Sequence, residues 1–308
     1  MEHRDRGPSA AGFACRSGHQ VRNRRSGIED HMTPLVLLTG GTGFVGRQVL
    51  RALTESGARV RVILREGTAE SRLGDLSAVE SIVRTPDLFR EPVEWWAKAL
   101  DGVDTVTHVA WYAEPGKYLQ SPENIVCLEG TLRMAQGAAI AGVKRFVGVG
   151  TCFEYDVSVG MLATDTPLRP ISPYAGAKAA VFMALSQWLP LHRISFAWCR
   201  LFYLFGEGED ERRLFPYLRA QLAAGKPVDL TSGNQIRDFL DVREAGRQIA
   251  DIGLGDRTGA ANICSGIPVT VRQIAERLAD EYGRRDLLRF GARPDNLVDP
   301  PCVVGLTR

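Results

Sequence analysis

The feature that most constrains this chain is a glycine-rich turn between its first apolar segment and its first helical stretch. The segment TGGTGFVG (39–46) places Gly40, Gly43 and Gly46 at the spacing GxxGxxG. The apolar run LVLL (35–38) precedes the turn, and a helical stretch (47–56) and a second apolar strand, ARVRVIL (58–64), follow it. Strand, tight turn, helix and strand within so short a segment predict a βαβ unit.

The missing side chains have a physical purpose in such a turn. They permit tight turning, let backbone N–H groups approach a pyrophosphate, and allow the helix to pack on the strand, while the helix dipole favours the anion. The alternative, a merely flexible turn, is disfavoured by the position directly after the first strand. The sequence therefore predicts a dinucleotide-binding turn, with cofactor contacts from Gly40, Thr42, Gly43, Phe44, Val45 and Gly46.

The pattern of apolar segments and helices continues to about residue 203. The alternation continues with the segments 79–84, 94–100 and 103–110, a helix expected at 125–142, the segment 145–150, a helix expected at 173–189 and the segment 194–202. Short apolar strands separated by helices predict an α/β fold, a Rossmann-type doubly wound parallel sheet covered on both faces.

The pattern also suggests how the chain is divided. Residues 33–203 are predicted to form the dinucleotide-binding domain, and residues 204–308 mainly a smaller α/β substrate-binding lobe, with some segments returning to the sheet. In that lobe we expect helices at 214–225 and 270–282, the second with Thr270 as N-cap, and strands at 227–230 and near Phe239. Residues 1–32 have no apolar period and are expected to be a disordered leader.

Composition excludes several classes of protein. The 308 residues carry a formal net charge of +2, which argues against a nucleic-acid partner. No apolar run is long enough to span a membrane or to serve as a secretory signal, so we expect a cytoplasmic enzyme. The six Cys form no CxxC pair and most of the five His lie in the first 32 residues, so neither a disulfide framework nor a metal site is expected.

The end of the second strand bears on the choice of cofactor. An NAD site would usually place Asp or Glu there to bind the ribose 2′-hydroxyl, and this sequence has Arg65. A guanidinium can pair with a 2′-phosphate, so the sequence favours NADP(H) over NAD(H). Alternatively, Arg65 is a solvated charge and Glu66 binds the ribose. Asp87 could accept a hydrogen bond from the adenine amino group or simply cap its loop.

A second motif lies in the helix expected at 173–189. Tyr174 and Lys178 form YxxxK, and residues four apart share one helix face. A nearby ammonium favours phenolate, so we expect Lys178 to lower the Tyr174 pKa from its usual value of about 10.

Taken in order, these motifs resemble the extended short-chain dehydrogenase/reductase family, which includes nucleotide-sugar epimerases, dehydratases and ketoreductases. The resemblance covers about residues 33–305. The matching segments are TGGTGFVG (39–46), PDL (86–88), HVAW (108–111), GVKRFVGVGT (142–151), TPLRPISPYAGAK (166–178), RLFYLFG (200–206), QIRDFLDV (235–242) and NICSG (262–266).

The resemblance implies a catalytic triad of Thr151, Tyr174 and Lys178. In this family the hydroxyl donates to a carbonyl oxygen, the tyrosine transfers the proton, and the lysine also binds the nicotinamide ribose. The matches PDL and HVAW further imply that Leu88 and Ala110 contact the cofactor. Thr151 could instead merely end a strand.

The sequence departs from the family after Thr151. Members that dehydrate the sugar at C5–C6 have Asp-Glu there to protonate the leaving hydroxyl and abstract a proton, whereas this chain has Cys152 and Phe153. A phenylalanine cannot act as a base, so 4,6-dehydration is not expected. Glu154 lies one position too late to replace the missing acid.

Several residues are expected to hold the substrate. The resemblance implies a diphosphate clamp of Arg237, with Arg293 as a second one, although either could be a surface ion-pair residue. Cys127 and Tyr203 stand where the family often has Asn. Trp111, Tyr112 and Tyr118 follow the fourth strand and could pack on a sugar or base, or equally in the core. The expected substrate-binding set is Trp111, Tyr112, Cys152, Phe153, Tyr203, Arg237 and Arg293.

The sequence thus favours an NADPH-dependent ketoreductase acting at C4 of a nucleotide-linked 4-keto-6-deoxyhexose. An epimerase that regenerates bound NAD is the alternative, and a non-catalytic dinucleotide sensor is a third, disfavoured because such proteins tend to lose the Tyr-Lys pair. The resemblance also implies a homodimer formed through the helices at 125–142 and 173–189.

Overall fold

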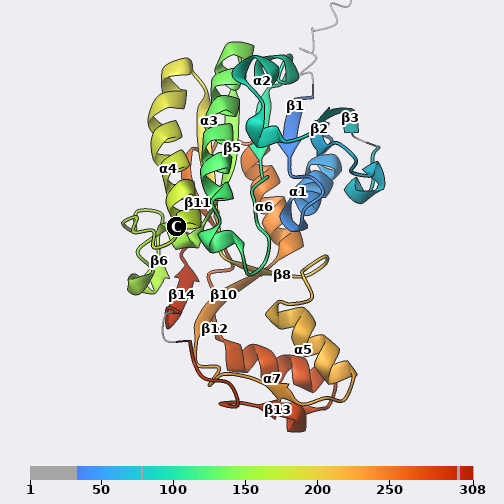
Figure 1. The fold of residues 1–308 in the computed structure, drawn as a ribbon, viewed down its shortest axis with the longest axis vertical. Helices are drawn as coiled ribbons and strands as arrows, with labels where there is room; N and C mark the ends of the chain where they lie inside the picture. The colour runs from blue at the N-terminus through green and yellow to red at the C-terminus, as the bar shows by residue number, and fades with distance from the viewer. Residues whose placement is uncertain (1–32, 78, 297–298, 308) are drawn as a thin grey trace, which may run out of the picture. The chain divides into compact units, whose positions relative to one another are not determined.

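The computed structural model describes residues 33–77, 79–296 and 299–307, and a parallel sheet forms its centre (Figure 1). The strand order is β11-β7-β5-β4-β1-β2-β3, and every neighbouring pair is parallel. The strands are β1 (Leu35–Thr39), β2 (Arg59–Arg65), β3 (Val79–Thr85), β4 (Thr105–His108), β5 (Arg145–Thr151), β7 (Ser195–Leu201) and β11 (Gly259–Ile263). The strand order reverses between β1 and β4, and sheets of this type bind ligands outside the carboxyl ends of the strands at such a point.

Helices cover both faces of the sheet (Figure 1). One face carries α1 (Phe44–Glu55) and α6 (Val242–Leu254), which share a core cluster that includes Val49, Leu53 and Ile249. The other face carries α2 (Val93–Ala99), α3 (Glu123–Ala141) and α4 (Pro173–Trp188), packed around Trp96 and Met134. Since both faces are covered, β1 and β5 are buried along their whole lengths, which explains their continuous apolar sequences. The predicted doubly wound fold is confirmed.

The remaining elements form a smaller α/β lobe. A mixed sheet has the order β12-β10-β14-β6, with β8 paired to β10, and β9 pairs with β13. The apolar faces of α5 and α7 meet in a core that includes Phe215, Leu218 and Leu278. The bounds are β6 (Met161–Leu162), β8 (Tyr203–Phe205), α5 (Leu214–Ala223), β9 (Val228–Asp229), β10 (Ile236–Asp241), β12 (Pro268–Thr270), α7 (Val271–Glu281), β13 (Leu288–Arg289) and β14 (Cys302–Gly305).

The lobe and the parallel sheet are interleaved in sequence. Helix α6 and strand β11 follow residue 203 but belong to the parallel sheet and its helical cover, and Thr33–Arg308 form one compact unit. Helix α7 begins as expected at Thr270, whose side chain accepts from the backbone N–H of Gln273 in a capping box. The expected disordered leader, residues 1–32, lies outside the described residues. Across the described part of the chain, no helix has both the length and the apolar character to cross a membrane.

Candidate functional site

In the glycine-rich turn, backbone atoms occupy the space that side chains would need. Gly40 has φ +76°, and a Cβ there would lie 2.7 Å from the backbone nitrogen of Ala110. A Cβ on Gly46 would lie 2.0 Å from the Gly40 carbonyl oxygen, which already accepts a hydrogen bond of 2.9 Å from the Gly43 N–H. Helix α1 has no side-chain N-cap and no acidic residue in its first turn. Its first N–H groups and positive dipole end are therefore suited to an anion such as a pyrophosphate.

A buried polar cluster fixes the adjacent end of β4. His108 places Nδ1 2.8 Å from the Thr39 hydroxyl and Nε2 3.0 Å from the Thr131 hydroxyl. The Thr39 hydroxyl also accepts a hydrogen bond of 3.2 Å from the Ala110 N–H. Burial lowers the His108 pKa to about 3, so this imidazole is neutral at physiological pH. His108 thus joins β1, β4 and α3 behind the turn, a positioning role that the sequence did not reveal.

The residues expected to select the cofactor lie at the ends of β2 and β3. Arg65 is the exposed last residue of β2, and its guanidinium has no hydrogen-bond or ion-pair partner within the described ranges. Glu66 is also exposed. Asp87 caps the short turn that contains Leu88: its carboxylate accepts from the Phe89 N–H at 3.0 Å and from Arg90 Nε at 3.2 Å. The loop-cap role considered for Asp87 is therefore present in the structure.

The three triad residues come from two adjacent elements. Thr151 is the buried last residue of β5, and Tyr174 and Lys178 lie in the first turns of α4. The Ser172 hydroxyl caps α4 by accepting from the Ala175 N–H at 3.2 Å, and Pro173 occupies the first helical turn. Helix α4 therefore starts where YxxxK faces the end of β5.

Lys178 is the most enclosed member of the triad. Its side chain is buried, and Nζ donates to the Val149 carbonyl at 2.5 Å and lies 3.8 Å from the centre of the Trp111 ring. Burial lowers its pKa from 10.5 to about 7, while the negative charge of Glu154 acts in the opposite direction.

The expectation that Lys178 lowers the Tyr174 pKa is wrong in this structure. Burial raises the Tyr174 pKa well above 10, and the Thr151 side chain, through hydrogen bonding, only partly counteracts this. The reason is geometric, because the Lys178 ammonium is directed to the Val149 carbonyl and the Trp111 face. Desolvation of the phenol therefore outweighs the charge four residues away.

Aromatic side chains surround the phenol. The ring centre of Tyr118 lies 4.8 Å from that of Tyr174 and that of Trp111 lies 6.5 Å away, both nearly perpendicular to it. Trp111 is held by a hydrogen bond of 2.8 Å from its indole N–H to Asn124 Oδ1. Tyr112 is half-buried, and its backbone hydrogen-bonds to the thiol of Cys127. Asn124, which fixes Trp111, is a further site residue that the sequence did not indicate.

Some of the residues expected to bind the substrate lie together in the structure. Arg237 is 3% exposed; its guanidinium pairs with Asp299 at 2.7 Å and lies 5.3 Å from the centre of the Tyr203 ring. The ring of Phe153 meets Tyr203 edge-on at 6.2 Å, and Cys152 is buried in the same cluster. Arg293 is exposed and instead donates to the Tyr217 hydroxyl at 3.0 Å.

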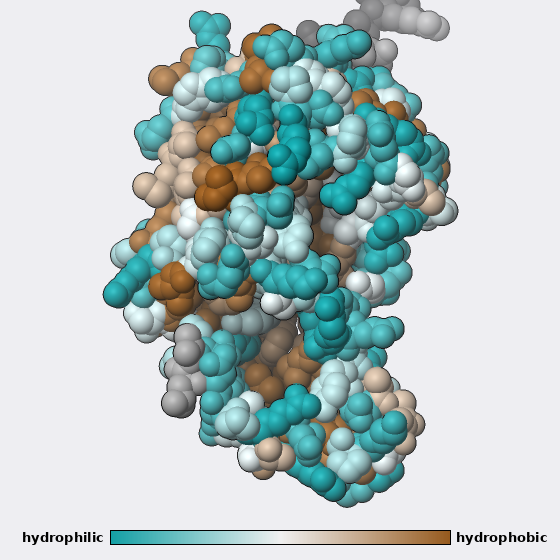
Figure 2. Space-filling model, viewed as in Figure 1, coloured by the Kyte–Doolittle hydropathy of each residue, from teal (hydrophilic) through white to brown (hydrophobic). Residues whose placement is uncertain are grey.

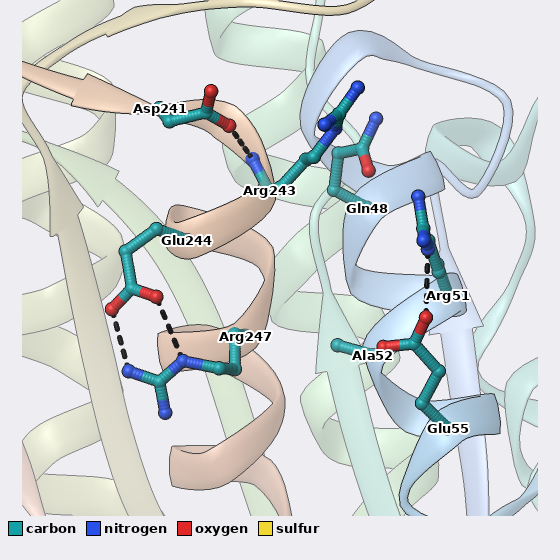
Figure 3. A pocket seen from close by; sticks show the side chains of 8 residues that line it. All are labelled: Gln48, Arg51, Ala52, Glu55, Asp241, Arg243, Glu244 and Arg247. Carbon is teal, nitrogen blue, oxygen red and sulfur yellow. Dashed lines mark hydrogen bonds and ion pairs between the residues drawn. The ribbon is translucent and has the colours of Figure 1, made fainter.

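The molecular surface is hollowed above the part of the lobe that carries α5 and α7, with apolar side chains at the bottom of the hollow (Figure 2). A different depression of about 350 Å³ lies between α1 and the start of α6 (Figure 3). Two of its arginines pair with carboxylates that also line it: Arg51 with Glu55, and Arg247 with Glu244. No triad residue lines this depression, so it is not the candidate active site.

The parallel sheet, its switch point and the glycine turn after β1 place the chain in the Rossmann class of α/β folds. The model of the NAD dependent epimerase/dehydratase family matches residues 36–250, and the chain belongs to that family.

Two curated relatives and one solved structure are similar over most of their length. dTDP-6-deoxy-L-talose 4-dehydrogenase (NAD(+)) of Aggregatibacter actinomycetemcomitans is 26% identical over 272 residues, covering 88% of this chain and 98% of the relative. dTDP-6-deoxy-L-talose 4-dehydrogenase (NAD(P)(+)) of Kitasatospora kifunensis is 29% identical over 269 residues, covering 82% of this chain and 81% of the relative. The crystal structure of dTDP-glucose 4,6-dehydratase from Streptomyces venezuelae with NAD bound covers 89% of this chain and 88% of its own, at 24% identity and a TM-score of 0.73.

Proposed function

We propose that this protein reduces the C4 ketone of a nucleotide-linked 4-keto-6-deoxyhexose with NADPH. The observation that carries the proposal is that Thr151 ends β5 and Tyr174 and Lys178 lie at the start of α4, in a sheet whose strand β1 leads into a glycine turn suited to a dinucleotide. The two curated relatives are named for oxidation at C4 of a dTDP-linked 6-deoxyhexose, the reverse of this reaction. We therefore take a dTDP-linked sugar as the first substrate to test.

The residues present suit a nicotinamide dinucleotide. The space at Gly40 and Gly46 that a Cβ would fill lets the backbone and the first N–H groups of α1 receive the pyrophosphate. Lys178 would hold the nicotinamide ribose, and Arg65, with no partner among the described residues, would receive a 2′-phosphate. The bound cofactor would supply the hydride that forms the new C–H bond at C4.

The chain itself supplies the proton. Because burial raises the Tyr174 pKa, the phenol keeps its proton at neutral pH and can give it to the C4 oxygen as that oxygen becomes an alcohol. The Thr151 hydroxyl would donate a second hydrogen bond to the same oxygen and stabilise its developing charge. Cys152 and Phe153 offer no acid or base for elimination of water, which supports reduction over dehydration.

Turnover of sugar nucleotides tests the proposal directly. Purified protein is incubated with a dTDP-linked 4-keto-6-deoxyhexose and NADPH, and with dTDP-6-deoxy-L-talose and NADP⁺, while absorbance at 340 nm is followed. We expect a fall in the first mixture and a rise in the second, with stoichiometric sugar conversion. Epimerised sugar without net absorbance change identifies the rival epimerase activity, and cofactor binding with no turnover of either kind supports the sensor alternative.

We also propose that two copies associate through α3 and α4. These helices pack side by side, and Ile125, Ile140 and Met183 on them are more than half exposed. A dimer would bury these side chains, and sedimentation equilibrium should give a mass near 68 kDa, twice the chain mass of 33.8 kDa. A mass near that of one chain at micromolar concentration contradicts this proposal.

A further inference from the structure

A buried carboxylate lies directly behind the end of β5. Glu154 is completely buried and accepts hydrogen bonds from the Thr151 N–H at 2.8 Å, the Trp198 indole N–H at 2.9 Å and Arg200 Nε at 2.7 Å. Arg200, on the neighbouring strand β7, is 1% exposed. Taking an ion pair out of water costs free energy, and apolar residues of similar size often serve stability as well. The pair therefore calls for a reason beyond stability.

The backbone of β5 is shaped to admit this cluster. A Cβ on Gly150 would lie 2.3 Å from Glu154 Oε1 and 2.2 Å from Trp198 Nε1. A Cβ on Gly148 would lie 2.3 Å from the Trp198 ring. Two strand positions thus lack side chains where Trp198 and the carboxylate pack against the strand that ends at Thr151.

The carboxylate and Thr151 hold each other reciprocally. While Glu154 accepts from the Thr151 N–H, the Thr151 hydroxyl oxygen accepts from the Phe153 N–H at 3.3 Å. This capping box fixes Thr151 with φ −145° and ψ 148°. The hydroxyl oxygen accepts this bond from the backbone, and the hydroxyl proton can be donated to an oxygen in the site, either that of Tyr174 or that of a substrate.

Glu154 cannot itself act on a substrate. Both of its oxygens are occupied by donors within the protein, and its side chain has no exposed surface. Its negative charge nevertheless affects Lys178, because it raises the Lys178 pKa against the effect of burial. Trp198, which donates to Glu154, also has its ring centre 5.8 Å from Lys178 Nζ.

We propose that Glu154 is a positioning residue, which holds the Thr151 backbone so that its hydroxyl donates to the substrate oxygen. The inference rests on the proposed reduction, in which Thr151 is catalytic. A displacement of a catalytic group by about 1 Å can cost on the order of 100-fold in rate. Loss of the Glu154 carboxylate should therefore lower kcat by about 10-fold to 100-fold with little change in KM.

A double-mutant cycle with Thr151→Ala tests whether Glu154 acts through Thr151. We expect Glu154→Gln to lower kcat in the wild-type background and to change it less than twofold in the Thr151→Ala background, with NADPH affinity retained. Equal factors in both backgrounds overturn the inference, because independent effects multiply.

Asp238 provides the matched control. It is also completely buried, and its carboxylate accepts from Ser265, Gly266 and Gly305 in the other sheet. Asp238→Asn should lower thermal stability as Glu154→Gln does, but change kcat by the same factor with or without Thr151→Ala. If Glu154→Gln fails to bind NADPH, Trp198→Phe takes its place in the cycle, since it removes one donor and keeps the Glu154–Arg200 pair; non-additivity again supports the inference and additivity overturns it.

Amide hydrogen exchange separates this inference from the proposed function. We expect Glu154→Leu, which leaves no side-chain oxygen to accept from the Thr151 N–H, to accelerate exchange at the Thr151 amide by at least tenfold while the amides of residues 145–149 keep their protection. Unchanged protection at Thr151 overturns the positioning role even if the wild-type protein reduces no sugar. Absence of turnover by the wild-type protein, by contrast, contradicts the proposed function alone.

Discussion

The pH dependence of stability offers a quantitative test of the site, because Lys178 is buried and its protonated form costs free energy in the folded state. Burial lowers its pKa from 10.5 to about 7. Each pKa unit corresponds to about 1.4 kcal/mol, so protonated Lys178 costs the folded state about 5 kcal/mol. Between pH 7, where the folded lysine is half protonated, and pH 10, just below the unfolded pKa, about 3 kcal/mol of this penalty should be lost.

The direction of the pH dependence follows from proton linkage. The folded pKa lies below the unfolded one, so between about pH 7 and pH 10.5 the unfolded chain binds more protons than the folded chain. Stability therefore rises with pH in this window, and the penalty is fully present only below about pH 7. Lys178→Met removes the titrating group and retains an unbranched side chain. The free energy of unfolding of this variant minus that of the wild type should fall by about 3 kcal/mol from pH 7 to pH 10.

Urea denaturation of both proteins at pH 7, 8, 9 and 10, followed by circular dichroism, measures this difference. Loss of the bond to the Val149 carbonyl shifts it equally at every pH, so the change with pH is the decisive quantity. Lys144→Met is the matched control, because the Lys144 side chain is 79% exposed and pairs with Asp104 at the surface. A difference for Lys178→Met that stays constant within 1 kcal/mol from pH 7 to pH 10 would refute the reasoning.

Three further substitutions test the reaction and the cofactor site. Tyr174→Phe should lower kcat by at least about 100-fold and leave the Kd for NADPH unchanged in a fluorescence titration; an unaffected rate contradicts the proton-donor role. Gly46→Ala brings a Cβ to 2.0 Å from the Gly40 carbonyl oxygen, so calorimetric titration should show lost NADPH binding, whereas retained affinity contradicts the proposed pyrophosphate cradle. Arg65→Ala should weaken NADPH binding by about 10-fold and leave NADH binding unchanged, as expected for loss of a charge-assisted hydrogen bond to the 2′-phosphate; equal effects on both cofactors contradict that contact.

The features that could be predicted from the sequence are local ones. The glycine turn, the Ser172-Pro173 start of α4 and the Thr270 cap of α7 each depend on a few consecutive residues. Helix α6 was missed although Asp241 caps it and its apolar residues, such as Val242 and Ile249, follow a helical period. Gly246 is small for a reason visible only in the structure: a Cβ there would lie 2.6 Å from the Gln48 backbone in α1.

Contacts between distant residues explain what the sequence could not reveal. Glu154 is 46 residues from Arg200, and the two meet because β5 and β7 are neighbours in the sheet. Arg237 and Asp299 are 62 residues apart, and their pairing shows that the Arg237 charge is already neutralised by a carboxylate before any phosphate arrives. The direction of the Tyr174 pKa was wrong for the same reason, because burial depends on residues such as Trp111 and Tyr118 that the YxxxK motif does not include.

Burial shifts the two titrating members of the triad in ways that matter for the proposed reaction. It raises the Tyr174 pKa, which keeps the phenol protonated and suits donation to a ketone. The same burial lowers the Lys178 pKa, which works against the charge that ribose binding requires. Glu154 and the Trp111 face both favour the protonated form of Lys178, so they counteract the effect of burial on its pKa. The Tyr174 phenol remains protonated. If Tyr174 is the proton donor proposed here, these shifts favour ketone reduction near neutral pH, and oxidation of the alcohol should require a higher pH at which Tyr174 can act as a base.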